Sequence, residues 1–306
     1  MRTLHAFTQF VVLVSLPLLL GGCGEKVTVE PEAEAEVKPA EGAPVKPNLK
    51  YEIKDGTVTI TGCDRKASGA LTIPATIEGI PVTSIGDYAF AYCTNLTSIT
   101  LPEGITIIGY GSFRECTSLK SITIPDSVTS IGHQAFQDCA NLTSITIPDS
   151  VTSIGLHAFD NCTSLTRITI PDSVTSIGGG AFYLCTNLKT ITIPDSVTSI
   201  GANAFSACSS LTSITIPDGV TSIGFYAFFN CTGLTSITIP DSVTSIGGGA
   251  FSKCSSLTSV TFLGDAPKEG RSVFSKATPT IYRKPEAKGW GDTFGGRPVK
   301  LISEKP

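Results

Sequence analysis

The sequence is poor in charged side chains and in histidine. Only 16% of its 306 residues are Asp, Glu, Lys or Arg, and one of its three histidines, His5, lies in an N-terminal leader. An ordinary globular chain has about 25% charged residues, and histidine is the usual carrier of protons near neutral pH. General acid–base chemistry therefore has few candidate groups in this chain.

Basic residues are not in excess either. The formal net charge is −4, whereas proteins that bind nucleic acid present a basic face to the phosphates. The balance argues against a nucleic-acid partner. The hydrophobic fraction of 41% is large enough to build a core, which excludes wholesale disorder.

The chain lacks an apolar run long enough to span a bilayer, which takes about 20 residues. The longest run, residues 10–20, follows Arg2 and precedes small residues, as in a secretion signal. Residues 20–23 (LGGC) resemble a bacterial lipobox. This resemblance implies a lipoprotein signal peptide over residues 1–22 and lipidation of Cys23. Gly24 after the cysteine implies sorting to the outer membrane.

Residues 23–49 begin with this cysteine and are otherwise rich in Glu, Pro, Ala and Lys. Such a composition buries too little apolar surface to offset the entropy of ordering. We predict a disordered tether with a reach of roughly 30 Å.

From Leu96 onward the sequence repeats every 23 residues as LTSITIPDSVTSIGxxAFxxCxx, and a degenerate first copy begins at Leu71. In the unit that begins at Leu142, alternating apolar and polar residues predict a strand with one buried face. Pro148 ends this strand. A second extended run stops at Gly155, which predicts a positive φ or a close approach of two backbones. The AFxxC spacing that follows predicts a short helical turn.

A period of 20–29 residues with Leu and Ile at fixed offsets is typical of leucine-rich repeats. We therefore predict a solenoid of about eight coils over residues 71–262, with parallel strands about 4.8 Å apart. One phenylalanine per coil forms its spine. The predicted caps are residues 50–70, which include a lead-in hairpin at 51–60, and residues 263–306, where Trp290, Phe294 and Ile281 cover the open end of the core.

The unit resembles the BspA-like subclass of leucine-rich repeats. This resemblance implies a surface-exposed bacterial or protozoan protein that adheres to matrix proteins or to other cells, without catalytic residues or a cofactor. The matching positions are core and turn residues, so they are specific for the fold and weak for the function.

Eight cysteines occupy one repeat position: Cys93, Cys116, Cys139, Cys162, Cys185, Cys208, Cys231 and Cys254. Stacked coils hold their Cβ atoms about 4.8 Å apart, more than the roughly 3.8 Å of a disulfide. We predict a buried ladder of free thiols. Cys63 has no partner in this register.

Aspartates also recur once per coil: Asp126, Asp149, Asp172, Asp195, Asp218 and Asp241. Calcium between neighbouring carboxylates is one interpretation. Capping of each Pro-Asp-Ser turn by the Asp side chain is the simpler one, and we predict no metal site. His133 and His157 lie in adjacent coils, but no nucleophile motif accompanies them. A hydrolase is therefore the weakest hypothesis.

The sequence favours a non-enzymatic, lipid-anchored module that binds a protein or glycan partner outside the cytoplasm. The alternative is a passive structural or ice-contacting surface, made by the outward Ser144, Thr146 and their equivalents. Binding residues are expected where the coils differ, which is at the two positions after the repeat glycine and the two after the repeat phenylalanine. The candidates are Phe225, Tyr226 and Phe229, with Tyr183 and Leu184 two coils earlier.

Overall fold

The computed structural model describes residues 48–305, which belong to one compact unit. Cys23, the leader and most of the predicted tether lie outside the described residues. Within residues 48–305 the structure contains no helix with the length and hydrophobicity that a bilayer crossing requires.

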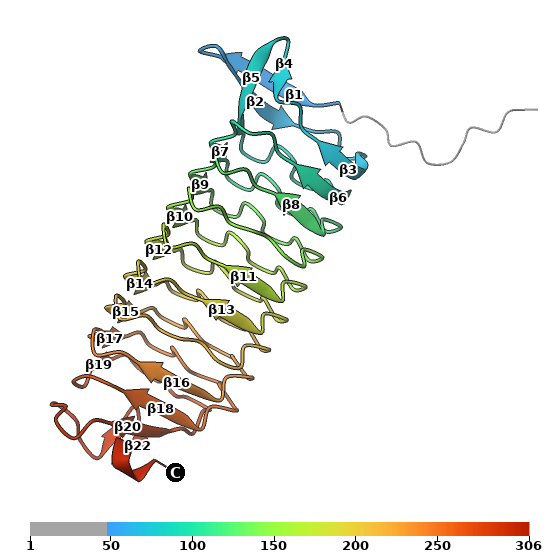
Figure 1. Ribbon diagram of the computed structural model, residues 1–306. Coiled ribbons are helices and arrows are strands. Elements are labelled where there is room, and N and C mark those ends of the chain that lie inside the picture. Colours follow the sequence, from blue (N-terminus) through green and yellow to red (C-terminus); the bar gives the residue numbers. More distant parts are fainter. Residues whose placement is uncertain (1–47, 306) are drawn as a thin grey trace, which may run out of the picture. The chain divides into compact units, whose positions relative to one another are not determined.

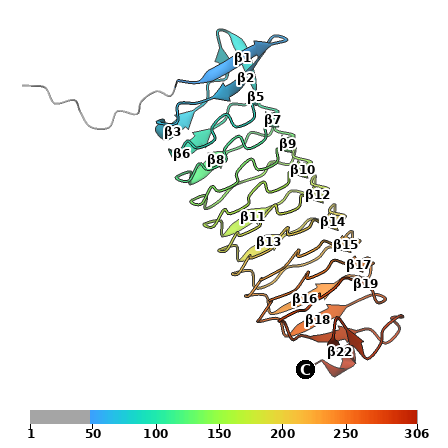
Figure 2. The same ribbon diagram turned by 180° about the vertical axis from the view of Figure 1, so that it is seen from behind.

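The coils stack in a row, with two ladders of short parallel strands along opposite edges (Figures 1 and 2). The larger ladder consists of β1 (Lys50–Lys54), β2 (Thr57–Gly62), β5 (Ile80–Ile85), β7 (Ile107–Ile108), β9 (Ser130–Ile131), β10 (Ser153–Ile154), β12 (Ser176–Ile177), β14 (Ser199–Ile200), β15 (Ser222–Ile223), β17 (Ser245–Ile246) and β19 (Lys268–Glu269), with β4 (Thr76–Ile77) beside β5. Paired residues of neighbouring coils are one repeat apart in the sequence, as Ser153 is from Ser130. From β5 to β17 the strands of the larger ladder end just before the repeat glycine, in a segment that reads VTSI in most coils.

The second ladder contains the LTSITI runs and is interrupted. It consists of β3 (Ser68–Thr72), β6 (Asn95–Thr100) and β8 (Ser121–Thr123), then β11 (Arg167–Thr169) and β13 (Thr190–Thr192), and finally β16 (Ser236–Ile239), β18 (Ser259–Phe262), β20 (Thr280–Arg283), β22 (Arg297–Leu301) and β21 (Thr293–Phe294). In the coil of Leu142, Ile145 is buried while Ser144 and Thr146 are exposed. The predicted alternation of buried and exposed residues is confirmed.

Phenylalanines stack through the core as predicted. The rings of Phe90, Phe113, Phe136, Phe159, Phe182, Phe205, Phe228, Phe251 and Phe274 form one column. Neighbouring ring centroids are 5.3 to 5.7 Å apart. The column extends one ring beyond the repeats counted in the sequence, and the solenoid has about ten turns where we expected about eight coils.

The two ends of the array differ from the regular coils. β1 and β2 form an antiparallel hairpin whose turn, Asp55-Gly56, has positive φ at both residues, and β2 then pairs in parallel with β5. At the other end the Trp290 ring lies 4.9 Å from Phe262 and 5.2 Å from Phe294. These aromatic contacts cover the end of the core.

The segment after the repeat glycine is not the short helical turn that the AFxxC spacing predicted. In the coil of Phe159, backbone N–H groups bond alternately within the coil and to the next coil: Ala158 donates to Gly155 O at 3.3 Å, and Phe159 donates to Ala181 O at 2.8 Å. An α-helix is 10–12 Å wide with its side chains, whereas neighbouring coils are about 4.8 Å apart. A chain of turns repeats at the same spacing as the strands, and the stack is therefore nearly straight (Figure 1).

The repeat glycine has the close backbone approach that we predicted and not a positive φ. A β-carbon on Gly155 would lie 2.6 Å from the carbonyl carbon of Gly132, the equivalent glycine one coil earlier. Such a distance is far inside van der Waals contact. The glycines of successive coils thus stack on one another.

The Pro-Asp-Ser turn is capped by serine and not by aspartate. Ser173 Oγ donates to Val151 O at 2.6 Å and Ser196 Oγ to Val174 O at 2.6 Å, in each case across to the preceding coil. Among the described residues, the Asp172 and Asp195 side chains make no hydrogen bond and are exposed. The interpretation that each Asp caps its own turn was wrong.

Candidate binding surface

One edge of the solenoid carries the residues that differ from coil to coil. We call the two positions after each repeat glycine the variable edge. Phe225 and Tyr226 occupy it in one coil, and their side chains are 52% and 36% exposed. Their ring centroids are 4.0 Å apart. This pair of exposed rings is the strongest candidate contact among the residues singled out in the sequence.

Phe229 packs against one member of this pair, Tyr226. Its ring is half-buried, lies 5.1 Å from the Tyr226 ring and has Lys253 Nζ 4.8 Å above it. The position directly after the repeat phenylalanine therefore faces partly inward. Ser206 in the preceding coil is only 1% exposed. The expectation that this position faces solvent was wrong, because the alternating turns direct it under the variable edge.

Tyr183 and Leu184 are less prominent than expected. Both side chains are half-buried, and Leu184 has a positive φ of 58°. Among the described residues no aromatic pair joins Tyr183 to Phe225 or Tyr226, which lie two coils away. The structure does not bring the five candidates together into one patch.

Glycines in the following coil make room for the large rings. A β-carbon on Gly248 would lie 2.9 Å from the Phe225 ring, and one on Gly249 would overlap the Tyr226 ring. Leu156 and His157 lie in the same way against Gly179 and Gly180. Two pairs of bulky residues on the variable edge, Phe225 with Tyr226 and Leu156 with His157, thus lie against a Gly-Gly pair in the next coil.

A second aromatic group escaped the sequence interpretation. Tyr88 and Tyr92 are 48% and 40% exposed in the first coil. The Tyr88 ring lies 5.1 Å from that of Tyr110, and Arg65 lies 5.2 Å above Tyr92. The signal was present, since these tyrosines occupy the same variable positions. The first copies of the repeat depart from the consensus, so the repeat positions of these tyrosines were not recognised in the sequence.

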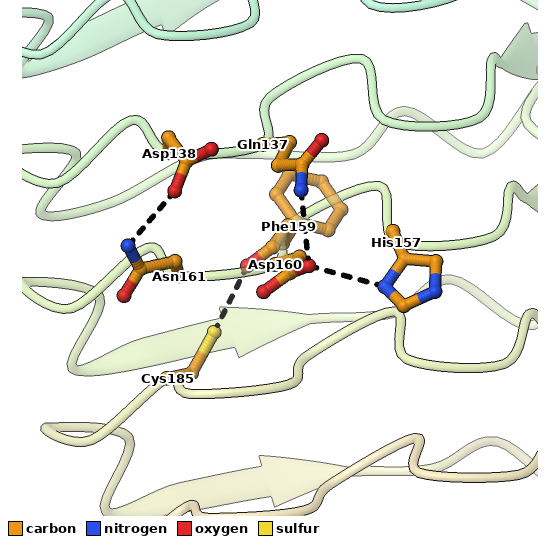
Figure 3. A network of polar contacts seen from close by, with 7 residues as sticks. All are labelled: Gln137, Asp138, His157, Phe159, Asp160, Asn161 and Cys185. Carbon is orange, nitrogen blue, oxygen red and sulfur yellow. Dashed lines mark hydrogen bonds and ion pairs between the residues drawn. The ribbon is translucent and has the colours of Figure 1, made fainter.

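His157 belongs to a polar network and not to a catalytic triad (Figure 3). His157 Nδ1 lies 3.1 Å from Asp160 Oδ2, which also accepts a hydrogen bond of 3.2 Å from Gln137. Beside this group Asn161 donates to Asp138 at 2.8 Å. Burial raises the pKa of Asp160, while His157 acts in the opposite direction. Among residues 48–305 no serine or threonine hydroxyl is hydrogen-bonded to His157, so the network contains no activated nucleophile.

The eight cysteines of the repeat are buried and unpaired. Desolvation is the main reason that the pKa of Cys116 rises to about 12, and the pKa of Cys254 rises likewise to about 12. Thiols with such pKa values are almost wholly protonated at neutral pH and are poor nucleophiles and metal ligands. No group of three or more His, Cys, Asp or Glu side chains in the described part of the chain is placed to hold a metal ion.

The coils are the signature of a known family. Its sequence profile, a BspA-type leucine-rich repeat region, matches residues 83–212 and 198–282. The chain belongs to the BspA-type leucine-rich repeat family. No curated protein matches the sequence.

Solved structures of leucine-rich repeat proteins resemble the solenoid. A leucine-rich repeat protein from Bacteroides ovatus is 29% identical, with a TM-score of 0.68 over 86% of this chain and 77% of that one. A leucine-rich cell surface protein from Faecalibacterium prausnitzii is 34% identical, with a TM-score of 0.60 over 79% of this chain and 77% of that one. The Treponema pallidum leucine-rich repeat protein is 28% identical, with a TM-score of 0.57 over 68% and 87%.

Proposed function

We propose that the chain is a non-enzymatic, lipid-anchored binding module that engages a protein or glycan partner outside the bacterial cytoplasm. Membership of the BspA-type family supports a role in protein interaction. The similarity to a cell surface protein of F. prausnitzii supports a place on the cell surface. The lipobox-like residues 20–23 support an anchor at Cys23, in the outer membrane or at the cell surface.

The observation that carries the binding role is the exposed ring pair of Phe225 and Tyr226 on the variable edge. Tyrosine and other aromatic residues are enriched among the residues that dominate binding energy. Contiguous apolar surface on a soluble face usually marks a contact. At the consensus positions of this coil only Gly219, in place of Ser, differs, so the rings are a local departure at positions that the fold leaves free.

The Ser/Thr strand face supports a passive or ice-contacting surface less well. Its regularity and the straight stack favour such an array, but Lys120, Arg167 and Lys189 interrupt it with long charged side chains.

The test uses the full chain on an array of extracellular matrix proteins and glycans. Replacing Phe225, Tyr226 and Phe229 by Ala, Asn and Ser copies the preceding coil, which has Ala202, Asn203 and Ser206. One hot-spot residue contributes about 2 kcal/mol, so we expect a loss of affinity of roughly 30-fold or more. The folded state should persist, because Asn tolerates the positive φ of Tyr226.

The matched control changes Thr212, Ser213 and Thr215 to Ala. These residues are exposed on the strand face of the same coil. The proposed function predicts that this control keeps full affinity. Undiminished binding by the aromatic variant together with weakened binding by the control would move the binding surface to the strand face.

A further inference from the structure

The cysteine ladder begins at Cys93, and the hydrogen-bond acceptor of this thiol differs from those of the other seven. From Cys116 onward, each ladder thiol donates to the carbonyl of the repeat phenylalanine in the preceding coil, as Cys116 does to Phe90 O at 3.1 Å and Cys254 to Phe228 O at 3.0 Å. The five thiols between them make the same contact at 3.1 to 3.2 Å. These seven sulfurs are held apart, each by its own acceptor.

Cys93 has no such acceptor, because no repeat phenylalanine precedes it. Its Sγ lies 3.9 Å from Asp64 O, and the Sγ of Cys63 lies 3.6 Å from the same oxygen. Strand β3 pairs Ser68 with Asn95, which places the end of the N-terminal hairpin segment alongside Cys93. The two side chains therefore converge on one point. The Cys93 thiol lowers the pKa of Cys63, and the Cys63 thiol raises that of Cys93.

Cys63 is accessible, whereas Cys93 is not. Cys63 is half-buried and lines a shallow depression with Leu49, Lys50 and Arg65, while Cys93 is fully buried beneath it. A partly exposed thiol beside a buried one is the arrangement in which the first attacks and the second resolves.

We propose that Cys63 and Cys93 form a disulfide that fastens the N-terminal hairpin to the first coil. The oxidant is a small-molecule or protein disulfide. The Cys63 thiolate attacks one sulfur of this disulfide, the S–S bond breaks, and one thiol leaves. Cys93 then gives up its proton and attacks Cys63 Sγ in the mixed disulfide, and the second thiol leaves. One disulfide is reduced to two thiols, which take up both protons, and the two cysteines are oxidised to one cystine.

This bond has a structural consequence at the place where a solenoid is weakest. A terminal coil has a neighbour on one side only, so it opens before the interior coils do. The hairpin β1–β2 covers the N-terminal end of the core, and its parallel contact with β5 is its link to the stack. A covalent link at Cys63 keeps the hairpin in place when these hydrogen bonds open.

The experiment incubates the reduced full chain with oxidised glutathione, denatures it without reductant, alkylates the free thiols and maps the peptides by mass spectrometry. We expect Cys63 and Cys93 in one linked peptide pair, lighter by two hydrogen atoms, and full alkylation at the seven cysteines from Cys116 to Cys254. In Cys63→Ser, Cys93 should be alkylated. In the matched variant Cys116→Ser the linked pair should still form.

Three results would overturn the proposal: alkylation of both cysteines after oxidation, a glutathione adduct on Cys63 with Cys93 alkylated, or a link from Cys93 to Cys116. A second measurement tests the fastening. Amide hydrogen exchange in β1 and β2 should slow several-fold on oxidation of the wild-type chain and stay unchanged in Cys63→Ser. Equal exchange in the oxidised and reduced wild-type chain would refute the fastening. Neither measurement depends on the proposed binding partner.

Discussion

The ring of Tyr226 lies over the α-carbon of Gly249 in the next coil, where a β-carbon would overlap it. The same relationship joins His157 to Gly180, and Tyr88 to Gly111. A bulky side chain at the second position of the variable edge is thus accommodated by a glycine one coil later. Any change to the aromatic cluster of Phe225, Tyr226 and Phe229 has to be considered together with this glycine.

We predict that Gly249→Ala destabilises the chain through two separable effects. Gly249 has a φ of +64°, and a β-carbon in this region costs about 1–2 kcal/mol. Displacement of the Tyr226 ring adds to this cost. In a Tyr226→Asn background the second effect disappears, so the loss of unfolding free energy should be smaller there. Denaturant unfolding of the wild-type chain, the two single variants and the double variant measures the coupling between Gly249 and Tyr226. An equal loss of unfolding free energy in both backgrounds would show that the Tyr226 ring moves aside without cost.

Within the aromatic cluster, the exposed ring of Phe225 should contribute less to the unfolding free energy than the half-buried ring of Phe229. Phe225→Ala removes a ring that is 52% exposed, and we expect it to change the unfolding free energy by about 0.5 kcal/mol or less. Phe229→Ser removes a half-buried ring that packs under Tyr226 and Lys253, and it should cost about 1–3 kcal/mol. Thermal unfolding of the two variants provides the comparison. The reverse order would place Phe225, and not Phe229, in the supporting layer.

Asp160→Asn is expected to change the pH dependence of stability. Burial raises the pKa of Asp160 in the folded chain, so the folded state prefers the protonated acid. Ionisation of Asp160 then costs stability as the pH rises from the unfolded-state pKa through the folded-state pKa. Above this window the Asn variant should be the more stable chain, and the two should converge in more acidic solution. Melting temperatures across the acid range measure the difference, and a constant offset at every pH would contradict the assignment.

The ladder thiols should be inert in the folded chain. Burial protects all eight, and their raised pKa values leave almost no thiolate at neutral pH. In the freshly reduced chain we expect no alkylation under native conditions from Cys93 to Cys254, and complete alkylation after denaturation. Mass spectrometry that found disulfides between successive ladder coils would refute the parallel column.

Lipidation of Cys23 stays a prediction, because this residue lies outside the described residues. Cys23→Ser should give an unprocessed or soluble product that leaves the detergent phase on phase separation, since several acyl chains are needed for stable anchoring. The wild-type chain serves as the control. Equal retention of both chains in the membrane fraction would remove the lipoprotein assignment.

The sequence by itself determined the coil. A period of 23 residues places Leu142, Ile145 and Phe159 at positions that every coil repeats, and stacking such coils is the one way to bury all of them at once. The phenylalanine column, the buried thiols and the alternation on the strand face follow from this repetition. The variable edge follows as well, since the two positions after the repeat glycine differ between otherwise uniform coils.

The tertiary structure decided which residues of different coils contact one another when their separation in the sequence is not the 23 residues of the repeat. The thiol of Cys116 reaches back 26 residues to Phe90, and Ser173 reaches back 22 residues to Val151. These contacts replace the predicted helical turn and the predicted role of aspartate, because coils about 4.8 Å apart satisfy backbone and side-chain polar groups across the stack rather than within one coil. The approach of Cys63 to Cys93 is of the same kind. It lies at the irregular end of the array, where no repeat exists from which a register can be read.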